Sequence, residues 1–121
     1  MQASVTFEDN VLIVGIEGYL KKDDAVKVFR LAEETRDLLE SSAVASVHVL
    51  FDLRNVHHIE PHVREALIAF LTTISKHVSR LASVTRSKDV REIEKTLYTL
   101  GGIGDVGTFN TMQKGLNWVR A

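Results

Sequence analysis

The sequence predicts an α/β fold: a mixed, mostly parallel sheet of about five strands with four helices, opened by a β-hairpin. Short apolar segments alternate with two-faced segments of helical length, the pattern of parallel strands joined by crossover helices. Near the N-terminus, two short strands are separated by Asp9 and Asn10, residues that tolerate a tight turn. Residues 46–53, SVHVLFDL, are apolar at both odd and even positions, as expected for a central strand that helices cover on both faces.

The hairpin and the first helix occupy the first third of the chain. Residues 5–7 and 11–16 are expected to pair as strands, and Gly18 follows the second of them. A helix is predicted over residues 23–40 because apolar residues recur there at helical spacing. Its inward residues are expected to be Ala25, Val28, Phe29, Ala32 and Leu39.

A second helix is predicted to begin at Pro61. Proline suits the first turn of a helix, where a missing N–H costs nothing, and Glu60 just before it sits where a carboxylate favours the positive end of the helix. The inward stripe is expected to be Val63, Leu67, Phe70, Leu71 and Ile74. Ile68 lies on the flank of this stripe and is expected to be partly separated from the core.

The last third of the chain repeats the alternation of strand and helix. Residues 80–85 and 105–109 are predicted strands, Ser87 is predicted to cap a helix that Gly101 and Gly102 end, and Asn110 is predicted to cap a final helix. The inward residues of the first of these helices are expected to be Val90, Ile93, Leu97 and Leu100. Those of the final helix are expected to be Met112, Leu116 and Val119, with Trp118 lying partly over its own core.

Composition narrows the classes of function. With 121 residues the chain is long enough for one core, and a single domain over residues 1–121 is expected. The balance of 15 basic and 16 acidic residues favours neither nucleic acid nor an anionic membrane as a partner. No cysteine is present, which excludes disulfides and thiolate metal ligands, and no apolar stretch approaches the ~20 residues of a spanning helix. A cytoplasmic location without a cofactor is the expectation.

The corner between the central strand and the second helix holds the residues with the most chemistry. His57, His58 and His62, together with Glu60, are ligand types that zinc accepts. Because Pro61 begins the helix, residue 58 is expected in the preceding loop, so the four-residue spacing to His62 does not place the pair on one helical face. No metal site is predicted, since histidines in loops are more often surface residues.

A catalytic site at the same corner would need a nucleophile, a base and an orienting group. Residues 47–71 contain no serine or threonine. Acid–base chemistry by His62 and Glu60 stays open, because ligands often bind α/β folds where helices begin at the carboxyl ends of strands. Asp52, at the predicted strand end, is expected to accept backbone hydrogen bonds in a turn.

Three segments of the chain carry a recognisable pattern: IVGIEGYL (13–20), VLFDLRNVHHIE (49–60) and VREIEKTLYTLGGIGDVGTFNTMQKGL (90–116). Together they resemble the STAS domain of the bacterial anti-sigma-factor antagonists, the SpoIIAA-like proteins. The residues that match the family pattern are Asp52, Leu53, Val56, Ile59, Glu60, Leu100, Gly101, Val106 and Phe109. The resemblance covers nearly the whole chain and implies the SpoIIAA-like fold.

The resemblance also implies a function, with one departure. Antagonists of this family carry two serines where the second helix opens, and a partner kinase phosphorylates the second; here those positions hold Pro61 and His62, so the serine switch is absent. The resemblance implies a non-enzymatic protein-binding module whose partner is an anti-sigma, kinase-like or sensor protein, with a homodimer as an additional expectation. The residues expected to bind the partner are Glu60, His62, Arg64, Glu65 and Ile68. The alternatives are a domain that binds a small lipid-like or anionic ligand and, with less support, a histidine-based enzyme.

Overall fold

The computed structural model describes residues 1–41 and 46–121 and contains a five-stranded mixed sheet with four α-helices. The strands are β1 (Gln2–Glu8), β2 (Val11–Leu20), β3 (Val47–Ile59), β4 (Val78–Val84) and β5 (Val106–Phe109). The helices are α1 (Ala25–Ser41), α2 (Pro61–Ile74), α3 (Lys88–Gly101) and α4 (Met112–Arg120), and single 3₁₀ turns occupy Lys22–Asp24 and Ser75–His77. The predicted order of elements and the opening hairpin are confirmed.

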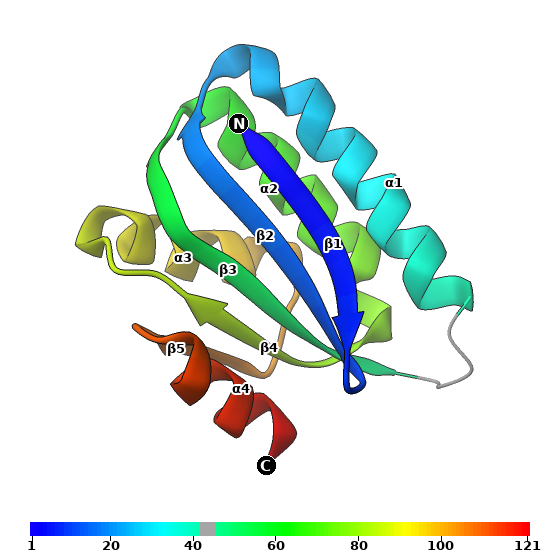
Figure 1. The fold of residues 1–121 in the computed structure, drawn as a ribbon. Coiled ribbons are helices and arrows are strands. Elements are labelled where there is room, and N and C mark those ends of the chain that lie inside the picture. The colour runs from blue at the N-terminus through cyan, green and yellow to red at the C-terminus, as the bar shows by residue number, and fades with distance from the viewer. Residues whose placement is uncertain (42–45) are drawn as a thin grey trace.

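The strands lie in the sheet in their order along the chain (Figure 1). β1 pairs antiparallel with β2, and every other neighbouring pair is parallel. Asp9 and Asn10 form the hairpin turn with positive φ angles of 47° and 68°, the left-handed conformation that a two-residue hairpin requires. Each later strand is added on the same side of the previous one, so right-handed crossovers place α1, α2 and α3 together behind the sheet.

The two faces of the sheet are covered unequally. The larger core lies between the sheet and α1, α2 and α3, and it includes Leu12, Val49, Phe51 and Phe70. On the other face α4 alone packs on the sheet, over a small cluster formed by Val11, Leu50, Ala82, Val84 and Val119. The prediction that helices cover the central strand on both faces is therefore right for its first half only, because β3 continues beyond the reach of α4 (Figure 1).

β2 and β3 are both longer than the sequence predicted. β2 does not end before Gly18 but includes it, with a φ of 105° between two register shifts, and β3 runs six residues past Leu53 to Ile59. The two strands stay paired as far as Leu20 and Ile59. Their mutual hydrogen bonds keep polar residues in the strands that would form a loop in isolation.

Two residues predicted to face the core are exposed. Phe29 of α1 is 50% exposed and Leu100 of α3 is 61% exposed. α2 packs against both α1 and α3, so these two helices are the ends of the layer and each has a flank with no neighbouring helix. Leu31 and Gly101 are buried in their place.

The final helix begins one residue later than predicted. Thr111, not Asn110, is the N-cap, because its backbone is extended and its Oγ1 accepts a hydrogen bond of 3.2 Å from the backbone N–H of Lys114. Trp118 lies partly over its own core, as predicted, with its ring 5.6 Å from that of Phe109. Among the described residues no helix has the length and apolar character needed to cross a membrane.

Candidate functional site

Glu60 joins the two corners at which β2 and β3 end. Its backbone N–H donates a 2.9 Å hydrogen bond to the carbonyl of Leu20, and its Oε2 accepts one of 2.8 Å from the backbone N–H of Lys22. Glu60 is the N-cap residue of α2, as predicted, but its carboxylate makes no hydrogen bond to α2. The carboxylate instead ties the 3₁₀ turn that precedes α1 to the start of α2.

The histidines of this corner point to different environments. His57 and His58 belong to β3 and not to a loop as predicted, so they project from opposite faces of the strand. His57 packs against the ring of Tyr19 with centroids 5.5 Å apart, and His62 is exposed in the first turn of α2. Within residues 1–41 and 46–121 no group of three His, Asp or Glu side chains is arranged to hold a metal ion.

A groove between α2 and α3 lies beyond this corner. It has a volume of about 340 Å³, and its lining residues are Arg64, Ile68, Glu92, Ile93, Thr96 and Leu97. Arg64 is held in place by a 2.9 Å hydrogen bond from its Nε to the carbonyl of Ile59. Ile68 and Ile93 are partly buried and pack against the main core. The groove therefore offers an apolar floor between one basic and one acidic side chain.

The structure divides the five residues predicted to bind a partner. Arg64 and Ile68 line the groove, whereas Glu60, His62 and Glu65 do not. Glu65 is exposed on the outer surface of α2. The half of the groove contributed by α3 was missed, because Ile93 and Leu97 have the spacing of core residues and nothing in that spacing shows that Ile93 lies at the core's edge.

A buried polar cluster lies beneath the groove. Glu94 of α3 is 1% exposed, and its Oε1 accepts a short hydrogen bond from the hydroxyl of Ser83 on β4. Burial raises the pKa of Glu94 to about 7, and burial also raises the pKa of the neighbouring Tyr98 well above its ordinary value. Leu97 lines both the groove and the enclosed cavity of about 30 Å³ that Glu94 faces. Sequence reasoning missed this cluster, although Glu94 stands four residues after Val90 and three before Leu97, the spacing of a single helical face.

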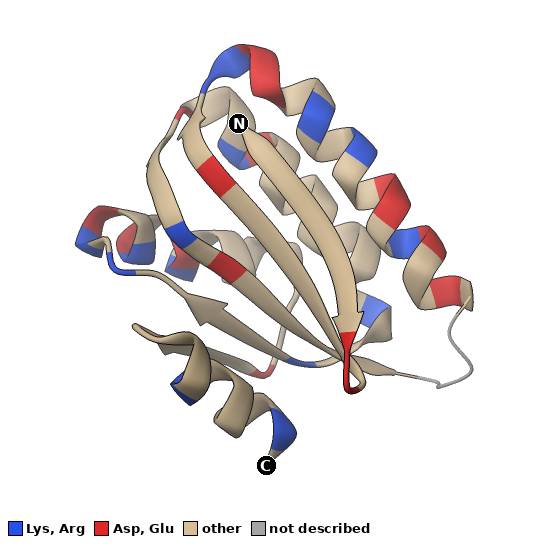
Figure 2. Ribbon diagram, viewed as in Figure 1, with Lys and Arg blue, Asp and Glu red and all other residues tan. Residues whose placement is uncertain are grey.

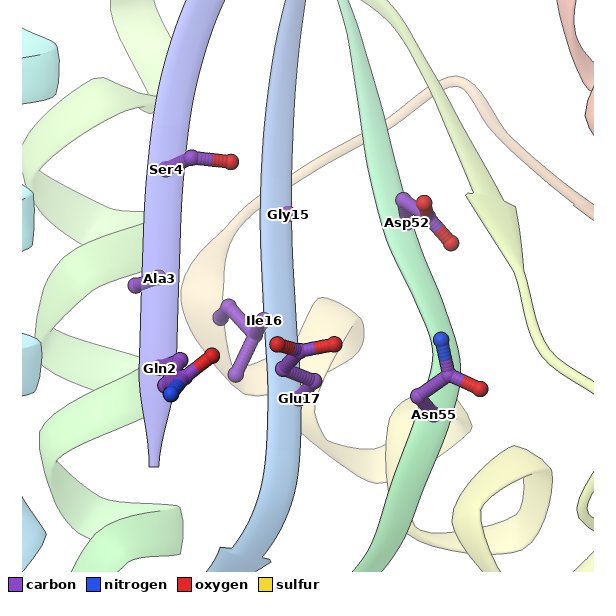
Figure 3. A pocket seen from close by; sticks show the side chains of 8 residues that line it. All are labelled: Gln2, Ala3, Ser4, Gly15, Ile16, Glu17, Asp52 and Asn55. Carbon is purple, nitrogen blue, oxygen red and sulfur yellow. The ribbon is translucent and has the colours of Figure 1, made fainter.

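The face of the sheet that α4 leaves open carries a second hollow. It has a volume of about 230 Å³ and lies over Gly15, walled by Ser4 of β1, Glu17 of β2, and Asp52 and Asn55 of β3 (Figure 3). Asp52 is in the middle of β3 and not at a strand end as predicted. The Arg54 guanidinium donates hydrogen bonds of 2.8 and 2.9 Å to the Asp52 carboxylate and thereby lowers its pKa.

Charge does not single out any one of these places. Basic and acidic residues are interspersed along α1 and at the start of α3 (Figure 2). Such a distribution creates no extended field of one sign, in agreement with the formal net charge of −1.

Comparison with solved structures agrees with this architecture over the whole chain. An anti-sigma factor antagonist from Mycobacterium paratuberculosis is 19% identical, with a TM-score of 0.72 over 99% of this chain and 94% of that one. An uncharacterised protein with a SpoIIAA-like fold from Shewanella loihica is 14% identical, with a TM-score of 0.70 over 98% and 92%. A variant of RsbS from Moorella thermoacetica is 16% identical, with a TM-score of 0.66 over 99% and 96%.

Neither protein-family models nor curated proteins match the sequence. At identities below 20% the structural neighbours establish a shared fold. The resemblance to STAS domains is thus confirmed at the level of architecture: this chain has the SpoIIAA-like fold.

Proposed function

We propose that residues 1–121 form a single cytoplasmic, non-enzymatic regulatory module that binds a protein partner in the groove between α2 and α3. The observation that carries this proposal is the groove itself, in which the partly buried Ile68 and Ile93 lie between Arg64 and Glu92. Small apolar anchors ringed by polar groups dominate the energetics of protein interfaces. The names of two structural neighbours, an anti-sigma factor antagonist and RsbS, support a regulatory protein over an enzyme.

The chemistry of the groove suggests what the partner presents. A volume of about 340 Å³ suits one or two apolar side chains, and Arg64 and Glu92 would pair with an acidic and a basic residue beside them. The resemblance makes a kinase-like anti-sigma factor or a sensor protein the proposed partner class. Glu60, His62 and Glu65 would then lie at the rim of the interface, where substitutions have smaller effects. Homodimerisation stays a prediction, to be checked by sedimentation.

The two alternative functions have less support. A lipid-like ligand would need an apolar pocket between the helices and the sheet, and the cavity there, beside Glu94, has a volume of only about 30 Å³, against roughly 300–1,000 Å³ for pockets that hold drug-sized ligands. The histidine-based enzyme would need a nucleophile near His62, and the corner sequence from 47 to 71 has no hydroxyl side chain before Thr72.

The test is to replace Ile68 with aspartate and measure capture of the partner. We expect Ile68→Asp to fold as the wild type does, because Ile68 is only partly buried, and to weaken capture from cell lysate by roughly tenfold or more. Bound proteins would be quantified by mass spectrometry. Thr72→Asp is the matched control, because Thr72 is exposed on α2 one turn further on and does not line the groove. Equal capture by the two variants would contradict the assignment of the groove.

A further inference from the structure

Glu94 is a carboxyl group buried without a full set of partners. Its Oε1 accepts from Ser83, whereas its Oε2 has no hydrogen-bond partner among the described residues. Oε2 is also shielded from solvent. A buried polar atom that lacks a partner costs free energy, and the cost is larger when the group is charged.

The surroundings of Glu94 do not compensate a negative charge. On its own helix the basic Arg91 lies one turn before it, and Tyr98 one turn after it. β4 contributes only the neutral Ser83. The residues of β2, β3 and α2 that line the cavity beside Glu94 are all apolar. Ionisation therefore leaves a charge in a largely apolar space, with the neutral hydroxyls of Ser83 and Tyr98 and one cation, Arg91, nearby.

The same helix forms one wall of the partner groove. Ile93 and Leu97 flank Glu94 in sequence, and Leu97 lines both the cavity and the groove. On the opposite wall, α2 contributes Leu67 and Leu71 to the cavity and Ile68 to the groove. A movement of α3 that brought water to Glu94 would consequently separate Ile93 from Ile68.

We propose that ionisation of Glu94 loosens α3 from the sheet and from α2, so that the protonation state of this one carboxyl controls the shape of the groove and partner binding. This inference rests on the proposed function of the groove. The described groove, with α3 packed against α2, belongs to the neutral form of Glu94. Partner binding is accordingly expected to strengthen as the pH falls. A proton would then act as a regulatory input in a chain that has no serine at the positions of Pro61 and His62.

The direction follows from proton linkage. The pKa of Glu94 is raised from 4.5 to about 7 by burial, so packing of α3 is fully supported below pH 4.5. Between those two values the packed form is weakened as the pH rises, by about a factor of ten in the opening equilibrium per pH unit. Above pH 7 Glu94 is ionised in both the packed and the open form of α3, so the opening equilibrium no longer changes with pH.

The experiment measures hydrogen exchange of backbone amides by NMR from pH 4.5 to pH 8, on the isolated protein and with correction for intrinsic exchange. We expect the opening equilibrium of α3 to rise about tenfold per pH unit up to pH 7, while that of α1 stays constant. Glu94→Gln should abolish the rise, since the amide has the same shape and does not titrate. Lys95→Gln is the matched control: it removes a charge from an exposed position of α3 that does not line the groove, and it should retain the rise.

A second measurement on the wild type guards against a variant that alters the fold. The carboxyl resonance of Glu94 should titrate near pH 7, far from the ~4.3 of an ordinary glutamate. Titration near the ordinary value, or the same pH dependence of α3 in Glu94→Gln as in the wild type, would overturn the proposal. The outcome is independent of the Ile68→Asp test, because hydrogen exchange needs no partner. The exchange result can support control of α3 by Glu94 even if the groove binds no partner, and the groove can bind a partner even if Glu94 does not control α3.

Discussion

Gly101 sets how closely α3 approaches α2. It lies in the last turn of α3 and is buried, and a Cβ atom built on it would overlap the Cβ of Leu71. The residue that ends the helix is Gly102, whose φ of 80° is left-handed and whose N–H bonds the carbonyls of Tyr98 and Thr99. Both glycines were predicted to end the helix, but only Gly102 does so, through its left-handed backbone, whereas Gly101 allows the close packing against Leu71.

Gly101→Ala is expected to destabilise the protein by about 2 kcal/mol, because the added methyl group must push apart two packed helices. Urea unfolding would measure the change. Gly104→Ala is the control, since a Cβ at that position meets nothing within 4 Å, and it should be neutral or slightly stabilising. If both variants have the same free energy of unfolding, the close approach of Gly101 to Leu71 does not limit packing.

At the scale of elements, Glu60 couples two β–α corners that are 38 residues apart in sequence. β2 and β3 end side by side, and the hydrogen bonds of Glu60 to Leu20 and Lys22 hold the end of β2 and the 3₁₀ turn before α1 against the start of α2. This side-chain role differs from the one the sequence predicted, in which the carboxylate serves its own helix. The Glu60 carboxylate accepts from the backbone N–H of Lys22, which follows the end of the neighbouring strand β2, and not from the backbone N–H groups of α2.

Glu60→Ala should therefore expose the Lys22 amide, which loses its acceptor, and lower the free energy of unfolding by roughly 1 kcal/mol. Hydrogen exchange of the Lys22 N–H would report the local effect and urea unfolding the global one. Glu65→Ala removes an exposed carboxylate from the same helix and should change neither. Unchanged protection at Lys22 in Glu60→Ala would show that the side-chain hydrogen bond does not stabilise the corner.

At the scale of the whole molecule, one sheet is shared by two cores. The large core lies under α1, α2 and α3, and the small cluster of Val11, Leu50, Ala82, Val84 and Val119 lies under α4. Adjacent residues of β3 serve different sides, since Val49 and Phe51 face the large core and Leu50 faces α4. Arg80 also ties α4 to the sheet, by donating to the carbonyl of Trp118 at 3.0 Å.

Because the strands belong to both cores, the two are expected to unfold together. Trp118 is the only tryptophan and packs with the small cluster, so its fluorescence reports on α4, whereas circular dichroism reports mainly on the other helices. We expect the two signals to have the same midpoint in urea. A fluorescence transition at lower urea than the dichroism transition would mean that α4 separates from the sheet as an independent unit.

Most of the fold could be predicted because it depends on local signals. The hairpin turn at Asp9 and Asn10, the start of α2 at Pro61 and the cap of α3 at Ser87 each follow from backbone preferences of a few residues. The alternation of strands and helices then leaves few topologies that bury every apolar face. Order, handedness and the SpoIIAA-like architecture were accessible for these reasons.

Local sequence signals thus specify which segments form strands and helices, and in what order. Where β3 ends, which flank of α1 and of α3 faces solvent, and the groove that Ile68 of α2 and Ile93 of α3 line near the buried Glu94 all follow from tertiary packing. These features depend on which element lies next to which, and periodicity along one helix carries no information about its neighbours. The candidate site arises from that adjacency: half of it was visible in the sequence of α2, and the other half was created when α3 packed beside it.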